Sequence, residues 1–149
     1  MDITRAYKEN NMELSKKQIY EIAEELEMGL ICYVHKETKK IIVLPDFDDP
    51  LAVDEDVWAE PIEEIESNFQ DYEKIEKMSS REGFRIMEDF TEQVTNKEIK
   101  SRLIYALERG KPFRNFKYEV DYNEDVRQQW FLYKNKRYQE YVKQYFLTL

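Results

Sequence analysis

The chain has 149 residues, 42% of them hydrophobic and 14% aromatic, which is enough for one domain with a core of its own. A single cysteine excludes an intrachain disulfide framework, and no apolar run approaches the ~20 residues of a membrane span. A net charge of −9 argues against generic DNA binding, which depends on neutralising phosphates. We therefore expect a soluble, cytoplasmic protein that does not contact the membrane.

The charge is unevenly distributed along the chain. Residues 46–76 carry 13 acidic side chains and one basic side chain, whereas residues 126–149 carry five basic side chains and one acidic. A nucleic-acid contact is therefore less expected than a protein contact, although a local basic region exists at the C-terminal end.

Residues 1–11 are polar and lack periodicity, which predicts a loose N-terminal arm before a single domain over residues 12–149. A first helix begins after Ser15, because Ser15 and Gln18 have the spacing of a capping box. Gly29 suits the left-handed position that ends this helix.

The next segments predict a small antiparallel sheet. Two β-branched runs form a hairpin over residues 30–45, and residues 72–77 are a possible third strand. A helix that starts at Pro61 lies between the hairpin and the third strand. Because glycine and proline are scarce, we predict a mostly helical α+β domain with about five helices, which cover one face of the sheet.

The later helices carry their own start signals. Ser79 and Glu82 have the spacing of a capping box, as do Thr95 and Glu98, and the second of these helices ends near Gly110. A final helix runs from about Asn123 almost to the end of the chain. Its aromatic residues cover more than one stripe, which is typical of a central helix or of one that contacts a second subunit.

Residues 111–134 support two interpretations. From Phe116 to Tyr122, aromatic or apolar residues alternate with charged ones, as in a half-buried strand whose exposed rings could stack on single-stranded bases. Pro112 is instead suited to start a helix, which would bury Phe113 and Phe116. Periodicity alone leaves both interpretations open.

The inventory of catalytic residues is small. His35 and Cys32 are the only residues of their types, and three positions along a strand place them on opposite faces. One histidine and one cysteine also fall short of a zinc site, and no phosphate-binding glycine pattern is present. We therefore expect no catalytic residue, no metal ligand set and no cofactor from these signals.

Two groups of carboxylates are candidate cation sites. The loop 46–56 departs from the EF-hand pattern, because Leu51 and Val57 stand where glycine and glutamate are required. Another site for a hard cation stays open there, although a solvated loop is the simpler interpretation; its candidate ligands are Asp46, Asp48, Asp49, Asp54 and Asp56. The second group is Glu88, Asp89 and Glu92, for which ion pairing with Arg81 and Arg85 is the simpler explanation.

Four short motifs occur in a fixed order along the chain. They are FRIMEDF at 84–90, AL at 106–107, KPFRNFK at 111–117, and Arg127 followed by Trp130 and Phe131. With them the chain resembles uncharacterised protein family 0158, a bacterial family without an assigned activity, from about Leu14 to Leu147. Residues 1–11 fall outside this range, and Met12 would be a natural start. The resemblance implies a bacterial cytosolic protein and a helix over Pro112–Val120, and it supplies no catalytic residue.

Three functional hypotheses follow, and they lean against an enzyme. The first is a non-enzymatic binding or regulatory module that contacts a protein partner or a second copy through Trp130, Tyr133, Tyr138, Tyr141 and Tyr145. The second is single-stranded nucleic-acid binding through Arg114, Lys117, Arg127, Lys134, Lys136 and Arg137. The third is a metal-dependent hydrolase that uses carboxylates of 46–56 or 88–92.

Overall fold

The structure is a computed structural model that describes residues 14–48 and 55–147. The predicted N-terminal arm, Asp49 and Asp54 lie outside the described residues. The described chain contains six α-helices and a three-stranded antiparallel sheet, which confirms the predicted mostly helical α+β class. Its contacts group into two compact units. We call Met1–Lys77 with Tyr138–Leu149 the sheet unit, and Met78–Arg137 the helical unit.

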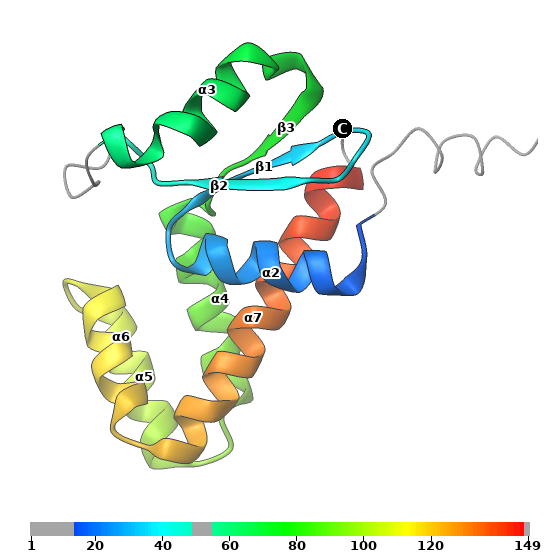
Figure 1. The fold of residues 1–149 in the computed structure, drawn as a ribbon. Helices are drawn as coiled ribbons and strands as arrows, with labels where there is room; N and C mark the ends of the chain where they lie inside the picture. Colours follow the sequence, from blue (N-terminus) through cyan, green and yellow to red (C-terminus); the bar gives the residue numbers. More distant parts are fainter. Residues whose placement is uncertain (1–13, 49–54, 148–149) are drawn as a thin grey trace, which may run out of the picture. The chain divides into compact units, whose positions relative to one another are not determined.

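The sheet unit contains the predicted hairpin and the predicted third strand (Figure 1). Its helices are α2 (Lys16–Glu27) and α3 (Ala59–Ser67), with short 3-10 turns η1 (Glu55–Trp58) and η2 (Phe69–Asp71) on either side of α3. The strands are β1 (Ile31–His35), β2 (Ile41–Leu44) and β3 (Tyr72–Ile75). Their order is β2-β1-β3, so the central strand β1 pairs with both neighbours.

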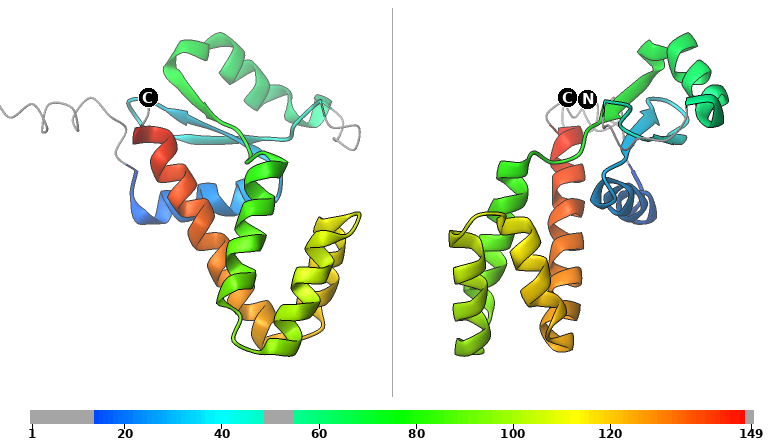
Figure 2. Two further views of the ribbon diagram at one scale, coloured as in Figure 1. Left: turned by 180° about the vertical axis from the view of Figure 1, so that it is seen from behind. Right: turned by 90° about the vertical axis from the view of Figure 1, so that its left-hand side faces the viewer.

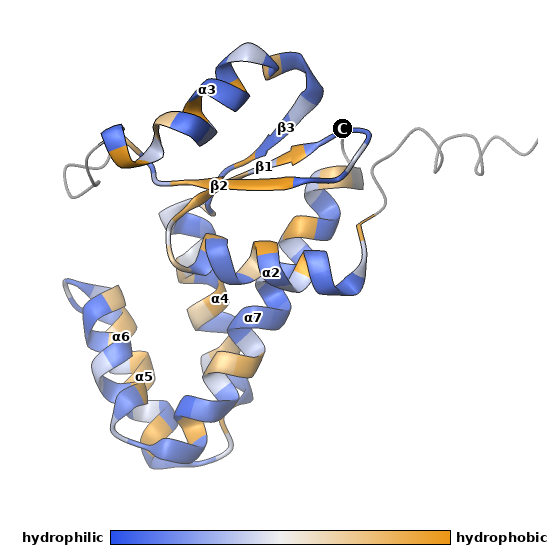
Figure 3. Ribbon diagram, viewed as in Figure 1, coloured by the Kyte–Doolittle hydropathy of each residue, from blue (hydrophilic) through white to orange (hydrophobic). Residues whose placement is uncertain are grey.

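Helices cover both faces of the sheet, which corrects the expectation of one covered face. Cys32 and Val34 lie on the face packed against α2 and the end of α7 (Glu124–Leu147), together with Val142. Ile42 and Leu44 lie on the other face with Ile65 of α3. The physical reason is that every residue of β2 is apolar, so that both of its faces must be covered (Figure 3).

Local capping signals explain where two of the helices begin. The Ser15 hydroxyl accepts a hydrogen bond from the backbone N–H of Gln18, and the Gln18 side chain accepts one from the Ser15 N–H, both at 3.1 Å. Gly29 ends α2 with φ +82°, a conformation that glycine adopts without strain. Ser79 caps α4 (Ser80–Gln93) by accepting from the Glu82 N–H at 3.2 Å. These three predictions are confirmed.

Three other helix boundaries differ from the predicted ones. The N-cap of α5 (Lys97–Glu108) is Asn96 rather than Thr95, because the Asn96 side chain accepts from the Ile99 N–H at 3.1 Å. Helix α3 begins at Ala59, so Pro61 lies within its first turn. The left-handed residue before α6 is Lys111, with φ 60°, and not Gly110. That turn is held by Asn115, whose side chain donates to the Gly110 carbonyl at 2.6 Å.

The helical unit consists of α4, α5, α6 (Pro112–Asp121) and the first part of α7. Helices α5 and α6 are antiparallel neighbours, joined by a short turn (Figure 2). Segment 112–121 is therefore a helix, as the resemblance implies, and the strand interpretation of Phe116–Tyr122 is wrong. Phe116 is 1% exposed, and its ring lies 6.4 Å from that of Phe90 and 4.9 Å from that of Trp130. This aromatic cluster is the reason that the segment is helical.

Helix α7 carries two separate buried stripes. Val126 and Trp130 belong to the core of the helical unit, and Val142 and Phe146 belong to the core of the sheet unit. Membership in two cores explains most of the aromatic residues on this helix, whereas Phe131 is 49% exposed.

Candidate binding surface

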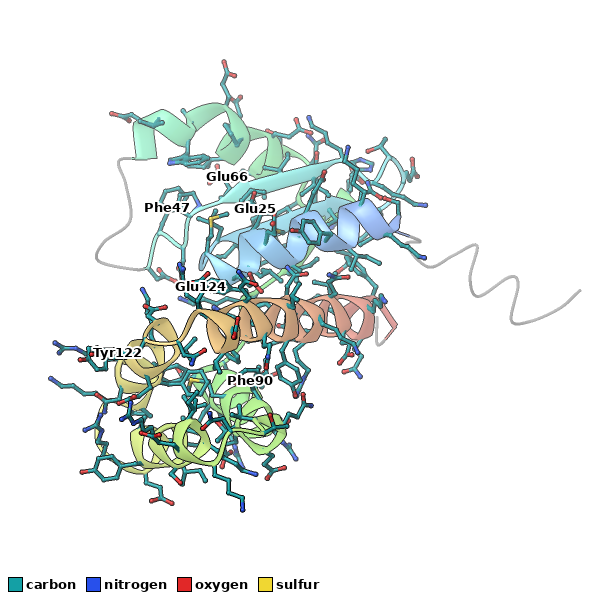
Figure 4. The ribbon with its side chains drawn as sticks, turned by 90° about the horizontal axis from the view of Figure 1, so that it is seen from below. Glu25, Phe47, Glu66, Phe90, Tyr122 and Glu124 are labelled. Carbon is teal, nitrogen blue, oxygen red and sulfur yellow. The ribbon has the colours of Figure 1, made fainter. Side chains whose placement is uncertain are left out.

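The tryptophan proposed as a contact residue is part of the core. Trp130 is only 9% exposed, and its ring lies 5.2 Å from the ring of Phe90. Phe90 lies among the helices of the helical unit, whereas Tyr122 lies at the edge of that unit (Figure 4). Trp130 therefore stabilises the fold and offers little surface to a partner.

Tyr133 and Arg137 form one hydrogen-bonded group with Asp89. The Arg137 guanidinium donates to the Tyr133 hydroxyl at 2.7 Å and to the Asp89 carboxylate at 2.8 Å. Burial lowers the pKa of Arg137, but these two hydrogen bonds outweigh burial, so that its pKa is raised overall. Asp89 thus pairs with Arg137 and not with Arg85, the partner expected from helical spacing.

Tyr141 and Tyr145 cap the outer edge of β3. The Lys36 N–H donates to the Asp71 carbonyl at 2.8 Å, and the alternation of an antiparallel ladder then turns the backbone groups of Lys74 and Glu76 away from β1. The Tyr145 hydroxyl donates to the Lys74 carbonyl at 2.5 Å, and the Tyr141 hydroxyl donates to the Glu76 carbonyl at 2.9 Å. Burial, and then the charges of nearby glutamates, raise the pKa of Tyr145.

Tyr138 packs against the same apolar cluster as Tyr141 and Tyr145. The five aromatic residues proposed as a contact surface are therefore divided between two cores and one sheet edge. The structure does not bring them together into one exposed patch.

The basic residues proposed for nucleic-acid contact also serve different purposes. Arg127 pairs with Asp121 at 3.5 Å and with Glu124 at 3.6 Å, and Arg137 is held by Asp89. Lys134 lies half-buried over the Trp130 ring, at 5.9 Å. The remaining three are exposed, and two of them are on α6; they are Arg114, Lys117 and Lys136.

An exposed aromatic pair lies at the C-terminal end of α6, the helix that also carries Arg114 and Lys117 of the nucleic-acid hypothesis. Tyr118 is 62% exposed and Tyr122 is 73% exposed, with ring centroids 6.0 Å apart. Both lie on the side of the helix away from Phe116 and Val120, and helical spacing places Arg114 on that same side. Lys111, the left-handed residue just before α6, is also exposed. We call Lys111, Arg114, Tyr118 and Tyr122 the α6 outer stripe. The four-residue interval between Tyr118 and Tyr122 indicates this stripe if the segment is taken to be a helix.

Asp46, like Asp89, is engaged in ordinary local contacts. Asp46 accepts from the Asp48 N–H at 3.0 Å and pairs with Lys77 at 3.5 Å. An open hollow along α4 is lined by two arginines and two glutamates, with one phenylalanine; these are Arg81, Arg85, Glu82, Glu88 and Phe84. Within residues 14–48 and 55–147, no three histidine, cysteine or acidic side chains gather closely enough to hold a metal ion.

Cys32 and His35 have structural positions. Cys32 is fully buried, and burial, with a smaller effect of Glu25, raises the pKa of its thiol to about 12. The His35 Nδ1 accepts from the N–H groups of Glu37 and Thr38, each at 3.1 Å, and so holds the hairpin turn. No described helix combines the length and the apolar character needed to cross a membrane.

Comparison with known proteins identifies a family that has no assigned activity. The model of the uncharacterised protein family UPF0158 matches residues 9–147, a range that begins slightly before the one suggested by the motifs. A protein of this family from Pseudomonas aeruginosa is 30% identical over 68 residues, which are 46% of this chain and 44% of that protein. The chain thus spans less than half the length of this curated relative, and no solved structure matches. The family match covers nearly the whole sequence, so the chain belongs to the uncharacterised protein family UPF0158.

Proposed function

We propose that this protein is a non-enzymatic binding module whose helical unit contacts a protein partner through the α6 outer stripe. The observation that carries the proposal is the exposure of Tyr118 and Tyr122 as neighbouring rings on a helix whose opposite side is buried. Tyrosine supplies a large contact area at low conformational cost, and it is enriched at protein interfaces. The five aromatic residues of α7 that the sequence favoured are divided between two cores and a sheet edge.

The charge of the stripe supports a partner with an acidic contact face. Arg114 lies on the same side of α6 as the tyrosines, Lys111 immediately precedes the helix, and both are exposed. The helical unit carries 13 Lys and Arg against 10 Asp and Glu, whereas the sheet unit carries 10 against 22. Complementary charge speeds association and selects among partners, so an acidic surface with an apolar centre suits this stripe.

The proposal is tested by affinity capture from lysate of the source cells with the full chain as bait. Changing Tyr118 and Tyr122 together to alanine should reduce recovery of the specific partner at least about tenfold, because exposed tyrosines at interface centres contribute up to several kcal/mol. The matched control is Phe69→Ala, which removes an aromatic side chain of similar exposure, 69%, from the sheet unit. Circular dichroism should show unchanged helix content in both variants.

Equal recovery of every protein by the wild type, the double variant and the control would reject this surface. So would a partner that is lost from the Phe69→Ala variant alone. Reversal of both Lys111 and Arg114 to glutamate should weaken the same complex, mainly by slowing association at low salt.

Single-stranded nucleic acid is the second candidate ligand for the same stripe. The observation that favours it is the adjacency of two exposed rings to two cations, since bases stack on aromatic rings while cations neutralise the phosphates. Fluorescence anisotropy with labelled DNA and RNA oligonucleotides should then show affinity that falls linearly with the logarithm of salt concentration. Removal of Lys111 and Arg114 should flatten this slope, and absence of binding at low salt would eliminate the candidate.

A further inference from the structure

Strand β2 has an outer edge that the rest of the described chain leaves unpaired. The His35 N–H donates to the Lys40 carbonyl at 2.8 Å, which fixes the phase of the ladder between β1 and β2. Because hydrogen-bonded pairs alternate along an antiparallel ladder, Ile42 and Leu44 turn their backbone groups toward β1. Ile41 and Val43 turn theirs outward, at the edge of the sheet opposite β3 (Figure 1).

Within residues 14–48 and 55–147, no hydrogen bond reaches the outward backbone groups of Ile41 and Val43. The strand also lacks the features that usually prevent pairing, since its sequence IIVL contains no charge, proline or bulge. The other edge of the sheet differs, because hydroxyls of α7 donate to the carbonyl of Lys74 in β3 and to that of Glu76 just after the strand. In the described chain, hydroxyl groups thus bond to one edge of this small sheet, whereas the backbone groups of the other edge stay unpaired.

We propose that β2 pairs antiparallel with β2 of a second copy of this chain, about a twofold axis at Ile42. In this register Ile41 lies opposite Val43 of the second copy, and Val43 lies opposite Ile41 of the second copy. Both are hydrogen-bonded pairs, so all the outward backbone groups of the two strands are satisfied. Each pair also places two β-branched side chains next to each other on one face, a favourable cross-strand combination.

The charges that flank β2 select this partner and this direction. Lys39 and Lys40 precede the strand, and Pro45 and Asp46 follow it. Antiparallel pairing places the two lysines of one copy beside the segment of the second copy that carries Asp46. Parallel pairing would place the lysines of both copies together, which is unfavourable. The occupant is therefore another β2 with its own lysine and aspartate ends. The inference concerns the sheet unit, so it does not depend on the proposed function of α6.

The mass of the full chain in solution tests the pairing. Sedimentation equilibrium or light scattering should give twice the 18.3 kDa of one chain at micromolar concentration. Val43→Pro removes an outward N–H without breaking the ladder to β1, so it should give a monomer with unchanged circular dichroism. The matched control is Lys74→Pro, which removes an outward N–H from the opposite edge of the sheet and should leave the dimer intact.

A crosslink tests the register, and it decides the question if the proline variant fails to fold. On the proposed axis, Ile42 faces Ile42 of the second copy as a non-hydrogen-bonded pair, with Cα atoms about 4.5 Å apart, within the range of a disulfide. Ile42→Cys should therefore form a disulfide-linked dimer under mild oxidation. Ile41→Cys, whose opposite residue is Val43, should remain uncrosslinked, and the native Cys32 is fully buried.

A wild-type chain that stays monomeric at high micromolar concentration would overturn the proposal. A dimer that survives Val43→Pro and gives no crosslink at position 42 would also overturn it, since its interface would then lie elsewhere. Capture of an extended peptide of another protein on a monomeric chain would assign the β2 edge to a different occupant.

Discussion

Single hydroxyl groups hold the end of α7 against the sheet. Tyr145 and Tyr141 each donate a hydrogen bond to a carbonyl at the outer edge of β3, where no strand is available. A phenolic oxygen can donate in this way only while it is protonated. The neutral form of Tyr145 is favoured further by burial and by Glu76 and Glu73 nearby, which raise its pKa above the ordinary value of 10.0.

Replacing Tyr145 with phenylalanine should lower the free energy of unfolding at pH 7 by about 1 kcal/mol, the net value of one hydrogen bond. The folded state holds the Tyr145 proton more tightly than the unfolded state does. Its contribution is therefore complete below pH 10 and is lost as the pH rises above 10. Urea denaturation from neutral to alkaline pH should show wild type and variant converging in this range.

The control for that measurement is Tyr118→Phe, which removes the hydroxyl of a residue that is 62% exposed and should change stability by less than about 0.5 kcal/mol. Parallel pH profiles of the wild type and Tyr145→Phe above pH 10 would contradict the assigned role of the hydroxyl.

Helix α5 shows how a single side chain sets the start of an element. Both Thr95 and Asn96 are good N-cap residues, but only the Asn96 side chain is bonded to the helix. Asn96→Ala should therefore cost about 1 kcal/mol of unfolding free energy, and Thr95→Ala less than about half of that. Thermal or urea denaturation of the two variants measures the difference. A larger loss of stability for Thr95→Ala than for Asn96→Ala would show that Thr95 is the N-cap, as the capping-box spacing predicts.

Capping and turn residues made most elements predictable from the sequence. Tertiary packing decided the conformation of segment 112–121 and which side chains are exposed. The Ser15 capping box, Gly29 and the hairpin depend on nearest neighbours, so the sequence alone indicated them. Segment 112–121 fits a strand pattern as well as a helix pattern, and the burial of Phe116 among other rings decides it. The exposed surface was harder to predict, because it depends on which of two cores each aromatic residue of α7 joins. Thus the sequence indicated Tyr118 and Tyr122 as exposed rings only under the strand interpretation, and whether the chain forms one domain stays a prediction.

At the scale of the whole molecule, the excess of acidic over basic residues belongs to one unit. The sheet unit has 22 acidic against 10 basic residues, whereas the helical unit is nearly balanced, with 10 against 13. Repulsion among like charges destabilises a compact state, and salt screens that repulsion. The two units should therefore respond differently to ionic strength.

Raising the ionic strength from about 0.01 M to about 0.15 M shortens the Debye length from about 30 Å to about 8 Å. Amide hydrogen exchange should then slow more in β1 and α2 than in α5 and α6. Mass-spectrometric exchange at two salt concentrations and one pH measures this difference peptide by peptide. Equal slowing of exchange in both sets of peptides would show that the acidic surplus does not destabilise the sheet unit.

The tyrosine-capped edge of β3 also limits how far any assembly can grow. A sheet with two open edges can add copies at both ends without a stopping point and so polymerise into fibres. Here the hydroxyls of Tyr141 and Tyr145 terminate one edge, so joining at β2 consumes the only strand available for extension in the described sheet. Association through the sheet is then self-limiting at two copies, and loss of both hydroxyls would convert a closed pair into a chain that can propagate.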